Sequence, residues 1–563
     1  MPAQTKAAIR KAVQVVIRGS PRVLINTNSG HLLDKAKQAS LFESLPVFKE
    51  LISSMTTHID DDHIQREVEQ YYRYATFSHT WEDNEPLFEK VVHIVVYDLD
   101  KSFTHDKLQM FCKIARDAGL HWAWSDTCCI NKADHIVLQE ALVAMFKWYE
   151  GSAVTIVFLR GVRSPSQRGD LMKSIWNTRG WTFQEYHASK VVRFYTEDWK
   201  PYLDLDIPNH KESPEIIEEM EEATTVSAQA LKDLRPGLGG IREKLCLASR
   251  RETTHVEDAA YSLLGIFSVS LPIVYGEGDH ALGRLLAQLL TSSGDTRILA
   301  WTGKSGAFNS CLPANIRVFN ELSTSHIAEM EAVSFRKRMS SPSFTLVMRL
   351  YDRLFGLPVP SFANQRMRLP CLTFKLGPVE ATRTASGYLF RARTGALGIV
   401  EIKTTEDLSR LDSLTLVHPW IDFLLHRKPV ERTTDVISEN TIHQPLSTPG
   451  SPTPPSRPNT APTSRPTRSS SLISRFGLPF MAGDSGSLLS PPPVTLTDRR
   501  DQGLQFIARL KQPFGALLFT RIRQNVEEYR RVAPESLITV QVEELSSKVL
   551  NKLIEGACTL DVL

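Results

Sequence analysis

The sequence predicts an α/β fold built around a mostly parallel sheet with helices on both faces. Between residues 74 and 196 the hydrophobic period changes in a repeating order, from short strand-like runs to stretches with helical spacing and back. Strands that alternate with helices of this length are typical of βαβ units, whose crossovers make the strands parallel. Ligands of such sheets bind beyond the carboxyl ends of the strands, so polar residues directly after a strand are the first candidates for a site.

The predicted elements follow one another in a regular order. Tyr74–Ser78 is a short buried strand, and apolar residues at helical spacing predict a helix over Lys107–Ala118 that Gly119 ends. Leu120–Trp124 has the alternation of a strand, and this run stops at Asp126. The remaining elements are a helix over residues 138–149, an apolar strand at 153–159, a helix around 181–188 and a strand at 190–196. Ser78 and Asp126 therefore lie at carboxyl ends of strands, where a ligand would be held.

Charge and composition narrow the class of partner. The chain has 563 residues, with 66 Lys and Arg against 63 Asp and Glu, which leaves a net charge of +3. No global positive field favours nucleic acid, and we expect no nucleic-acid partner. The longest apolar-leaning run, residues 259–275, is interrupted by Ser, Gly and Pro and is shorter than the roughly 20 residues of a bilayer span. Seven cysteines, two of them adjacent, suit a reduced chain, so we expect a cytoplasmic protein without a membrane span.

A low-complexity tract divides the C-terminal half. Residues 445–471 contain eight Pro, twelve Ser or Thr and no acidic residue, and the poor composition continues to about residue 495. Such a segment buries too little apolar surface to offset its ordering entropy, which predicts a disordered linker or insert over residues 445–495. Strand-like runs on both sides, in residues 304–444 and 496–563, predict a β-rich C-terminal part. The sequence leaves open whether these two stretches complete one domain.

The string RGWTFQE, from Arg179 to Glu185, carries the most chemical information. In a helix, Trp181 and Glu185 are four residues apart and share a face, so the indole can wall a pocket that holds the carboxylate. An apolar wall raises the pKa of a carboxylic acid or leaves its charge unscreened, and either effect suits acid or electrostatic catalysis. The alternative is a Trp in the core and a solvated Glu near the start of a helix, where the helix dipole favours an acid.

Two other strings suggest different chemistry. Cys128 and Cys129 are candidate nucleophiles or zinc ligands, but no protease signature or CxxC pair accompanies them, and small buried side chains are the simpler interpretation. Gly276–Ala281 has the G-x-G-x-x-A spacing of a dinucleotide-binding turn before a helix. The acidic residue that this fingerprint needs about 20 positions later is missing, so a turn followed by a helix is the better interpretation. We expect no metal site and no required cofactor.

Three ordered strings resemble the fungal heterokaryon incompatibility (HET) domain. They are Tyr74–Trp81 (YATFSHTW), Trp124–Ile130 (WSDTCCI) and Arg179–Glu185 (RGWTFQE). Residues 253–286 are similar to the segment that commonly follows this domain, so the resemblance covers about residues 22–303. The chain departs from the family pattern at Glu82, Asn131 and Lys132. These three positions are therefore poor candidates for functional residues.

The resemblance and the composition together divide the chain into six segments. The segments are an N-terminal extension (1–70), the HET domain (71–205), a helical family-typical extension (206–303), a β-rich C-terminal region (304–444), the Pro/Ser/Thr-rich linker or insert (445–495) and a C-terminal region that is a candidate to complete the β-rich domain (496–563).

The resemblance also implies a fold and a site. The HET domain is similar to the Toll/interleukin receptor (TIR) fold, a flavodoxin-like α/β domain of which several members cleave NAD. TIR enzymes carry a Trp-x-x-x-Glu string with a catalytic Glu, and Trp181-x-x-x-Glu185 has this spacing. The resemblance thus points to Glu185 as the catalytic residue and to NAD as a substrate. The NAD-binding residues that it implies are Ser78, His79, Trp81, Asp126, Arg179 and Trp181.

The role implied is that of a toxic effector in programmed cell death after fungal non-self recognition, a form of innate immunity. Its reaction would be the cleavage of NAD to nicotinamide and ADP-ribose. The main alternative is a non-enzymatic, TIR-like scaffold in cell-death signalling, which would act through self-association or a recognition partner protein. A third interpretation, a hydrolase that uses Cys129, predicts loss of function in Cys129→Ala with NAD chemistry untouched.

Overall fold

The computed structural model describes most of the chain outside the low-complexity tract. The described residues are 2–55, 58–224, 226–320, 341–377, 379–384, 387–411, 413–420, 496–523, 526–542 and 544–563. The predicted linker at 445–495 lies outside them. Within the described part, no helix has both the length and the apolar character needed to cross a bilayer.

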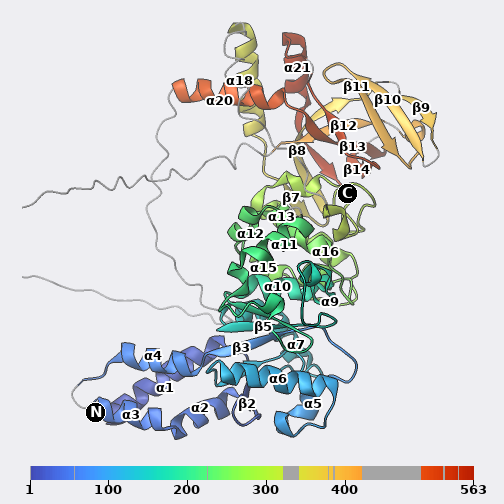
Figure 1. The fold of residues 1–563 in the computed structure, drawn as a ribbon. Helices are drawn as coiled ribbons and strands as arrows, with labels where there is room; N and C mark the ends of the chain where they lie inside the picture. The colour runs from blue at the N-terminus through green and yellow to red at the C-terminus, as the bar shows by residue number, and fades with distance from the viewer. Residues whose placement is uncertain are drawn as a thin grey trace, which may run out of the picture. The chain divides into compact units, whose positions relative to one another are not determined.

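A six-stranded sheet forms the core of the N-terminal half (Figure 1). Its strands, in the order β2–β1–β4–β3–β5–β6, are β1 (Val23–Asn26), β2 (Leu32–Asp34), β3 (Tyr74–Ser78), β4 (Trp122–Trp124), β5 (Val154–Leu159) and β6 (Val192–Thr196). Strands β4, β3, β5 and β6 run parallel, and β1 pairs antiparallel with β4 and β2. The predicted α/β class and the parallel pairings are confirmed. The flavodoxin-like TIR topology stays a prediction.

Helices connect the parallel strands, as the changes in hydrophobic period predict. The connections are α5 (Phe88–Val91), α6 (Phe103–Asp117), α7 (His135–Glu150), α8 (Asp170–Lys173), α9 (Ile175–Thr178) and α10 (Gly180–Ala188), with a 3-10 turn η1 at Val96–Asp98. Ser102 and Asp134 cap α6 and α7 by accepting bonds from backbone amides of the first turn. Gly119 adopts φ 78° after α6, a left-handed conformation that glycine accepts without strain.

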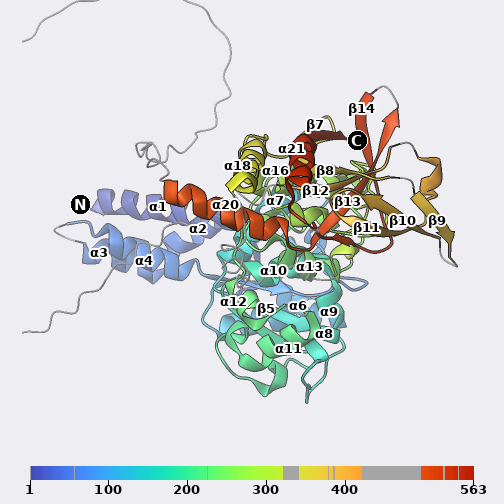
Figure 2. The ribbon, with the colours of Figure 1, turned by 90° about the horizontal axis from the view of Figure 1, so that it is seen from above.

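The sheet begins upstream of the predicted domain boundary. Strands β1 and β2 lie within residues 1–70. Strand β2 pairs with β1, and β1 pairs with β4 through Ile25 and Asn26. These strands are three and four residues long and are separated by the polar run TNSGH, so their periodicity is too short to be read from the sequence. Four helices accompany them: α1 (Pro2–Gly19), α2 (Lys35–Ser44), α3 (Pro46–Ser54) and α4 (Asp61–Tyr71). Helix α1 packs against α3 and α4 (Figures 1 and 2).

The segment after the sheet is helical. Its helices are α11 (Pro214–Thr224), α12 (Ala228–Asp233), α13 (Ile241–Ser249), α14 (Asp258–Tyr261), α15 (Leu264–Phe267) and α16 (His280–Ser293), with 3-10 turns at Tyr202–Asp204, His210–Glu212, Thr296–Leu299 and Ile316–Phe319. Helix α10 of the first region packs against α14 and α15 of this extension. The extension therefore contacts the helix that carries Glu185.

The C-terminal part is rich in β-strands, as predicted. Its strands are β7 (Ser361–Ala363), β8 (Arg366–Lys375), β9 (Val379–Arg383), β10 (Tyr388–Thr394), β11 (Gly398–Thr404), β12 (Thr415–Pro419), β13 (Phe514–Arg523), β14 (Val526–Val532), β15 (Ile538–Val540) and β16 (Ala557–Val562). Its helices are α18 (Ser341–Phe355), α20 (Leu496–Leu510) and α21 (Ser547–Gly556), with a 3-10 turn at Leu408–Arg410. Helix α18 packs against α21 (Figure 2). Because β12 pairs with β13 and β8 pairs with β16, chain from both sides of the low-complexity tract shares one sheet.

Candidate active site

Glu185 is buried against the carboxyl end of strand β3. The strand ends at Ser78, whose Oγ donates a hydrogen bond to Glu185 Oε2. The indole of Trp176, in α9, in turn donates from Nε1 to Ser78 Oγ at 2.7 Å. Only 6% of the Glu185 residue surface is exposed, so the alternative of a solvated Glu is wrong. An indole, a hydroxyl and a carboxyl group thus form one buried chain of hydrogen bonds.

This environment changes the protonation of Glu185. Burial, followed by the negative charge of Asp126, raises the pKa of Glu185 to about 8. Hydrogen bonding with Ser78, the charge of Arg251 and hydrogen bonding with Tyr149 oppose the rise without cancelling it. Glu185 is therefore mostly a neutral acid at pH 7 in the free protein.

Asp126, beyond the end of β4, has the opposite environment. Trp81 Nε1 donates to Asp126 Oδ2 at 2.9 Å, and His79 Nε2 lies 3.7 Å from Asp126 Oδ1. The Lys132 ammonium lies 3.3 Å from the centre of the Trp81 ring, a cation–π contact. Burial opposes ionisation of Asp126, but its interactions with His79, Lys132 and Trp81 outweigh burial and lower its pKa. Asp126 is therefore an anion at pH 7.

A buried ion pair supports the histidine. Lys107 binds Glu85 and also donates to the Thr80 carbonyl at 3.3 Å, and both charged side chains are almost fully buried. The His79 ring stacks on Phe77 with ring centres 4.3 Å apart, and its Nδ1 lies 3.1 Å from the Thr80 carbonyl. These contacts hold the imidazole in place, so its other nitrogen faces Asp126.

Cations from the extension hold both ends of α10. Arg251 donates to the Arg179 carbonyl at 3.0 Å, to Thr182 Oγ1 at 2.9 Å and to Asn177 Oδ1 at 2.8 Å. At the other end, Lys211 donates to the carbonyls of residues 186 and 189 at 3.0 and 2.8 Å. The carbonyls at a helix C-terminus lack partners within the helix, and a lysine there satisfies them. Residues outside the predicted domain thus position the helix that carries Glu185.

Two predicted binding residues make their contacts elsewhere. Arg179 donates to Thr254 Oγ1 at 3.4 Å, and the Trp181 indole hydrogen-bonds Asp258. Both contacts lie in the extension. In the described structure, Trp176 is the tryptophan whose indole connects to Glu185, through Ser78. The sequence analysis did not select Trp176. A wall formed by Trp181 stays a prediction without a contact to support it.

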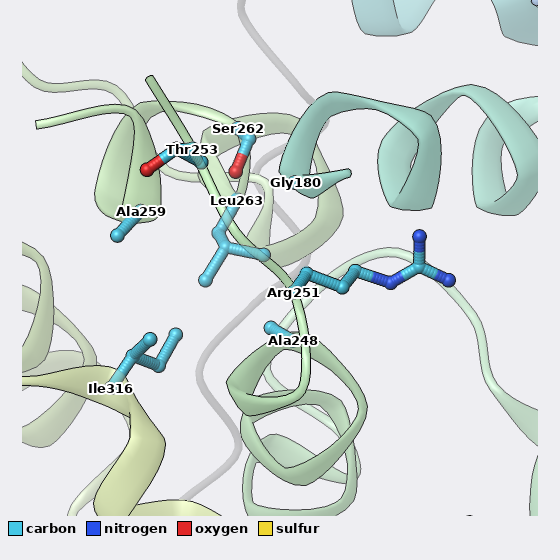
Figure 3. Close-up of a pocket in the computed structure, with 8 residues that line it drawn as sticks. All are labelled: Gly180, Ala248, Arg251, Thr253, Ala259, Ser262, Leu263 and Ile316. Carbon is cyan, nitrogen blue, oxygen red and sulfur yellow. The ribbon is translucent and has the colours of Figure 1, made fainter. Parts of the chain in front are cut away.

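A small recess lies beside the start of α10. Gly180, Arg251 and Thr253 line it with mostly apolar neighbours (Figure 3), and the full set is Gly180, Ala248, Arg251, Thr253, Ala259, Ser262, Leu263 and Ile316. A Cβ at Gly180 would lie 2.4 Å from Thr253 Cγ2, so glycine is required for this close approach. The recess contains none of Ser78, Asp126 and Glu185, and it belongs to the packing of α10 on the extension.

The cysteine alternative finds little support in the structure. Cys128 and Cys129 are buried, and a hydrogen bond with Cys129, together with burial, raises the pKa of Cys128 well above its usual value. A nucleophilic thiol needs a lowered pKa and access to substrate. Within the residues that the structure describes, no group of three or more His, Cys, Asp and Glu side chains is arranged to hold a metal ion.

The backbone amides of the glycine turn at residues 276–278 bind the side-chain carboxylate of Glu257. The amides of Gly276 and Gly278 donate to Glu257 Oε1 at 2.8 and 3.0 Å. Residues 271–275 before the turn form no strand, whereas α16 begins at His280 directly after it. The interpretation as a turn followed by a helix is confirmed. The amides of Gly276 and Gly278 donate to Glu257 and are therefore not free to bind a phosphate group.

Comparisons with known proteins cover part of the chain that forms this site. Residues 74–169 match the family model described as heterokaryon incompatibility protein (HET). The similarity to this family is therefore shown for residues 74–169. It is also 34% identical over 224 residues to vegetative incompatibility protein HET-E-1 of Podospora anserina, an alignment that covers 38% of this chain and 16% of the relative. No solved structure was found to match.

The match places the candidate residues in two groups. Ser78, His79, Trp81 and Asp126 lie inside the matched HET domain, and Glu185 lies after its last matched residue. The geometry nevertheless joins Glu185 to this domain through Ser78. The site is therefore composite, with the strand ends from the HET domain and the acid from α10.

Proposed function

We propose that this chain is an effector of heterokaryon incompatibility and that its HET domain cleaves NAD between nicotinamide and ribose. The matched family and the similarity to an incompatibility protein support the cellular role, which is cell death after non-self recognition. The observation that carries the chemical part is the pair of carboxyl groups, Asp126 and Glu185, at the ends of parallel strands. Neighbouring carboxyl groups whose environments move their pKa values in opposite directions are typical of acid and base assignments in enzymes.

The substrate explains why such a pair is useful. Nicotinamide in NAD is a cationic leaving group, so the reaction needs no strong general acid. It needs negative charge beside the ribose to offset the oxocarbenium character of the transition state, and then a water molecule. When the cationic nicotinamide ring binds beside Glu185, its positive charge favours ionisation of this carboxyl group. The buried carboxylate would then stabilise the positive charge of the transition state.

The remaining residues have supporting roles in this proposal. Trp81 is 47% exposed and Lys132 lies against one face of its ring, so a nicotinamide or adenine ring would stack on the other face. Asp126 and His79, which lie 3.7 Å apart, would bind ribose hydroxyl groups at the same strand ends. Trp176 and Ser78 hold the Glu185 carboxyl group in one orientation.

The proposal is tested by nicotinamide release from NAD by the purified full-length protein. Glu185→Gln preserves the shape of the side chain but cannot ionise, and we expect a loss of roughly 10³-fold in kcat/KM, the size typical for one electrostatic group in a closed site. Glu219→Gln is the matched control, because Glu219 is also buried but binds Tyr202 and Met172 away from the site. Equal turnover in wild type and Glu185→Gln would exclude Glu185 as the catalytic residue.

A self-associating scaffold is a second candidate function, and one surface favours it. Ile136 and Val143 are seven residues apart on α7 and are 78% and 59% exposed. At this spacing they lie on the same face of the helix, where a second copy could cover them. A double Glu substitution at these positions should lower self-association and toxicity while turnover per folded protein persists. Toxicity that survives Glu185→Ala but fails in the double variant would favour the scaffold over the enzyme.

A further inference from the structure

Two cysteines face each other across the C-terminal sheet. Cys371 in β8 and Cys558 in β16 are directly opposed in the antiparallel register. Opposed residues of antiparallel strands project from the same face, with Cα atoms about 4.5–5.5 Å apart. Disulfides span Cα separations of about 4.4–6.8 Å, so this pair can be bridged without moving either strand.

The two thiols have unequal environments. Cys371 is fully buried and its Sγ donates to the Cys558 carbonyl at 3.6 Å, whereas Cys558 is partly exposed. Hydrogen bonding with the side chain of Cys371, followed by that with Thr373 and the charge of Arg353, lowers the pKa of Cys558 to about 7 against the opposing effect of burial. Arg353 is held at this position by its hydrogen bond to the Ala557 carbonyl at 3.0 Å. One accessible thiol thus lies beside a buried one.

We propose that Cys371 and Cys558 form an oxidation site at which a hydroperoxide converts the two thiols into a disulfide between β8 and β16. The thiolate of Cys558 attacks a peroxide oxygen, an S–O bond forms, the O–O bond breaks and water leaves after protonation. The sulfur of Cys371 then attacks the sulfenic acid at Cys558, the S–S bond forms, and a second water leaves with the Cys371 proton. Two thiols are oxidised and one hydrogen peroxide is reduced to two waters.

The position of the pair gives this step a structural consequence. Strand β16 ends at Val562, whose carbonyl accepts from Asn309 Nδ2 at 2.9 Å, and the next carbonyl, of Leu563, accepts from the Ser310 amide at 3.0 Å. A disulfide would fix β16 to β8, and the end of β16 binds the segment that contains Asn309 and Ser310. It would also close a covalent loop between residues 187 apart in sequence, which restricts the unfolded chain.

The experiment treats the reduced full-length protein with hydrogen peroxide and maps its cysteines by alkylation and mass spectrometry. We expect a cross-linked peptide that contains Cys371 and Cys558, and a rise of roughly 5–10 °C in the Tm of the C-terminal part that reductant reverses. In Cys371→Ser a sulfenic acid trap should label Cys558, and in Cys558→Ser it should leave Cys371 unlabelled. Cys246→Ser, which removes a buried thiol elsewhere, should oxidise like wild type.

Two results would overturn the proposal. One is the absence of the 371–558 cross-link in folded protein at peroxide concentrations that oxidise other cysteines. The other is equal rates of alkylation of Cys558 and the buried cysteines in pulse-labelled wild type, a measurement that remains valid if a Ser variant fails to fold. The test requires no NAD turnover, so its outcome is independent of the function proposed for the HET domain.

Discussion

Two glutamates in this protein expose the same small fraction of their surface but have pKa values shifted in opposite directions. Glu185 and Glu257 are each 6% exposed. Burial opposes ionisation of Glu257, but its own backbone amide and those of Gly278 and Gly276 outweigh burial and lower its pKa, whereas Glu185 has a pKa raised to about 8. Glu257 completes a turn, and Glu185 lies beside a second carboxylate at the ends of parallel strands. Glu185 lies deep in the protein and Glu257 nearer its surface, so depth and the surrounding donors together separate the structural carboxylate from the candidate catalytic one.

The largest expected difference between the two glutamates is the pH dependence of stability. Glu185 has a raised folded pKa, so its contribution to stability is complete below its unfolded pKa of 4.5 and is lost as pH rises through about 8. Glu257 has a lowered folded pKa, so its contribution is present above the unfolded pKa and is lost as pH falls through the folded value. Relative to Glu185→Gln, the wild-type free energy of unfolding should fall by on the order of 4 kcal/mol between pH 5 and pH 8.

Chemical denaturation of the wild type, Glu185→Gln and Glu257→Gln across this pH range measures both effects. Glu257→Gln should change how the free energy of unfolding depends on pH in the acidic range. It should leave unchanged the decrease in that free energy between pH 5 and pH 8. A wild type and a Glu185→Gln variant with parallel stability curves from pH 5 to pH 8 would show that Glu185 is ionised in the folded protein, which contradicts the comparison.

A smaller effect is expected when the donor to Glu185 is removed. Ser78→Ala deletes the hydrogen bond that lowers the pKa of Glu185 and leaves Trp176 Nε1 without its acceptor. We expect the pKa of Glu185 to rise further and the protein to lose about 1–2 kcal/mol of stability. Ser249→Ala, in which a buried serine loses only a bond to the Cys246 carbonyl, is the control. An unchanged midpoint of the pH dependence in Ser78→Ala would show that this hydrogen bond does not control the acid.

The smallest expected effect comes from Arg251, which acts on Glu185 through charge and through the placement of α10. Arg251→Gln removes a cation that lowers the pKa of Glu185, so the midpoint should move to higher pH. Arg251→Lys keeps the charge but loses the planar fork that binds three acceptors, so it should restore the midpoint while stability stays below wild type. Equal midpoints in wild type and both variants would show that the extension only packs against α10.

The parallel strands and their helices could be predicted from the sequence because each spans enough residues to show its period. Strand β5 and helix α7 are examples, with six and sixteen residues. Strands β1 and β2 could not be predicted, since both are short and β1 joins the sheet through β4, whose paired residues lie 96 and 98 positions later in the chain. Pairing of that kind is a property of the folded chain.

The candidate site, like the sheet, could be predicted only where a local sequence pattern marks the residue. Ser78, Asp126 and Glu185 could be selected because each lies at a strand end or in a recognisable string. Trp176 could not, because it joins Ser78 only through contact between residues 98 apart in sequence. Arg251 and Lys211 lie in the extension, and no local pattern connects them to α10. The wall formed by Trp181 stays a prediction, and the contact that the structure gives the Trp181 indole is a hydrogen bond with Asp258.

The most direct test of the account is the pH profile of kcat/KM for NAD cleavage by the full-length wild-type protein and by Glu185→Gln. The free-enzyme profile reports the ionisation of essential groups. We expect the wild-type value to rise with pH and level off with an apparent pKa near 8, as the reactive carboxylate forms, and Glu185→Gln to show no such rise and a roughly 10³-fold lower plateau. A profile that is flat between pH 6 and pH 9, or a variant that retains the wild-type plateau, would contradict the assignment of Glu185 as the catalytic residue.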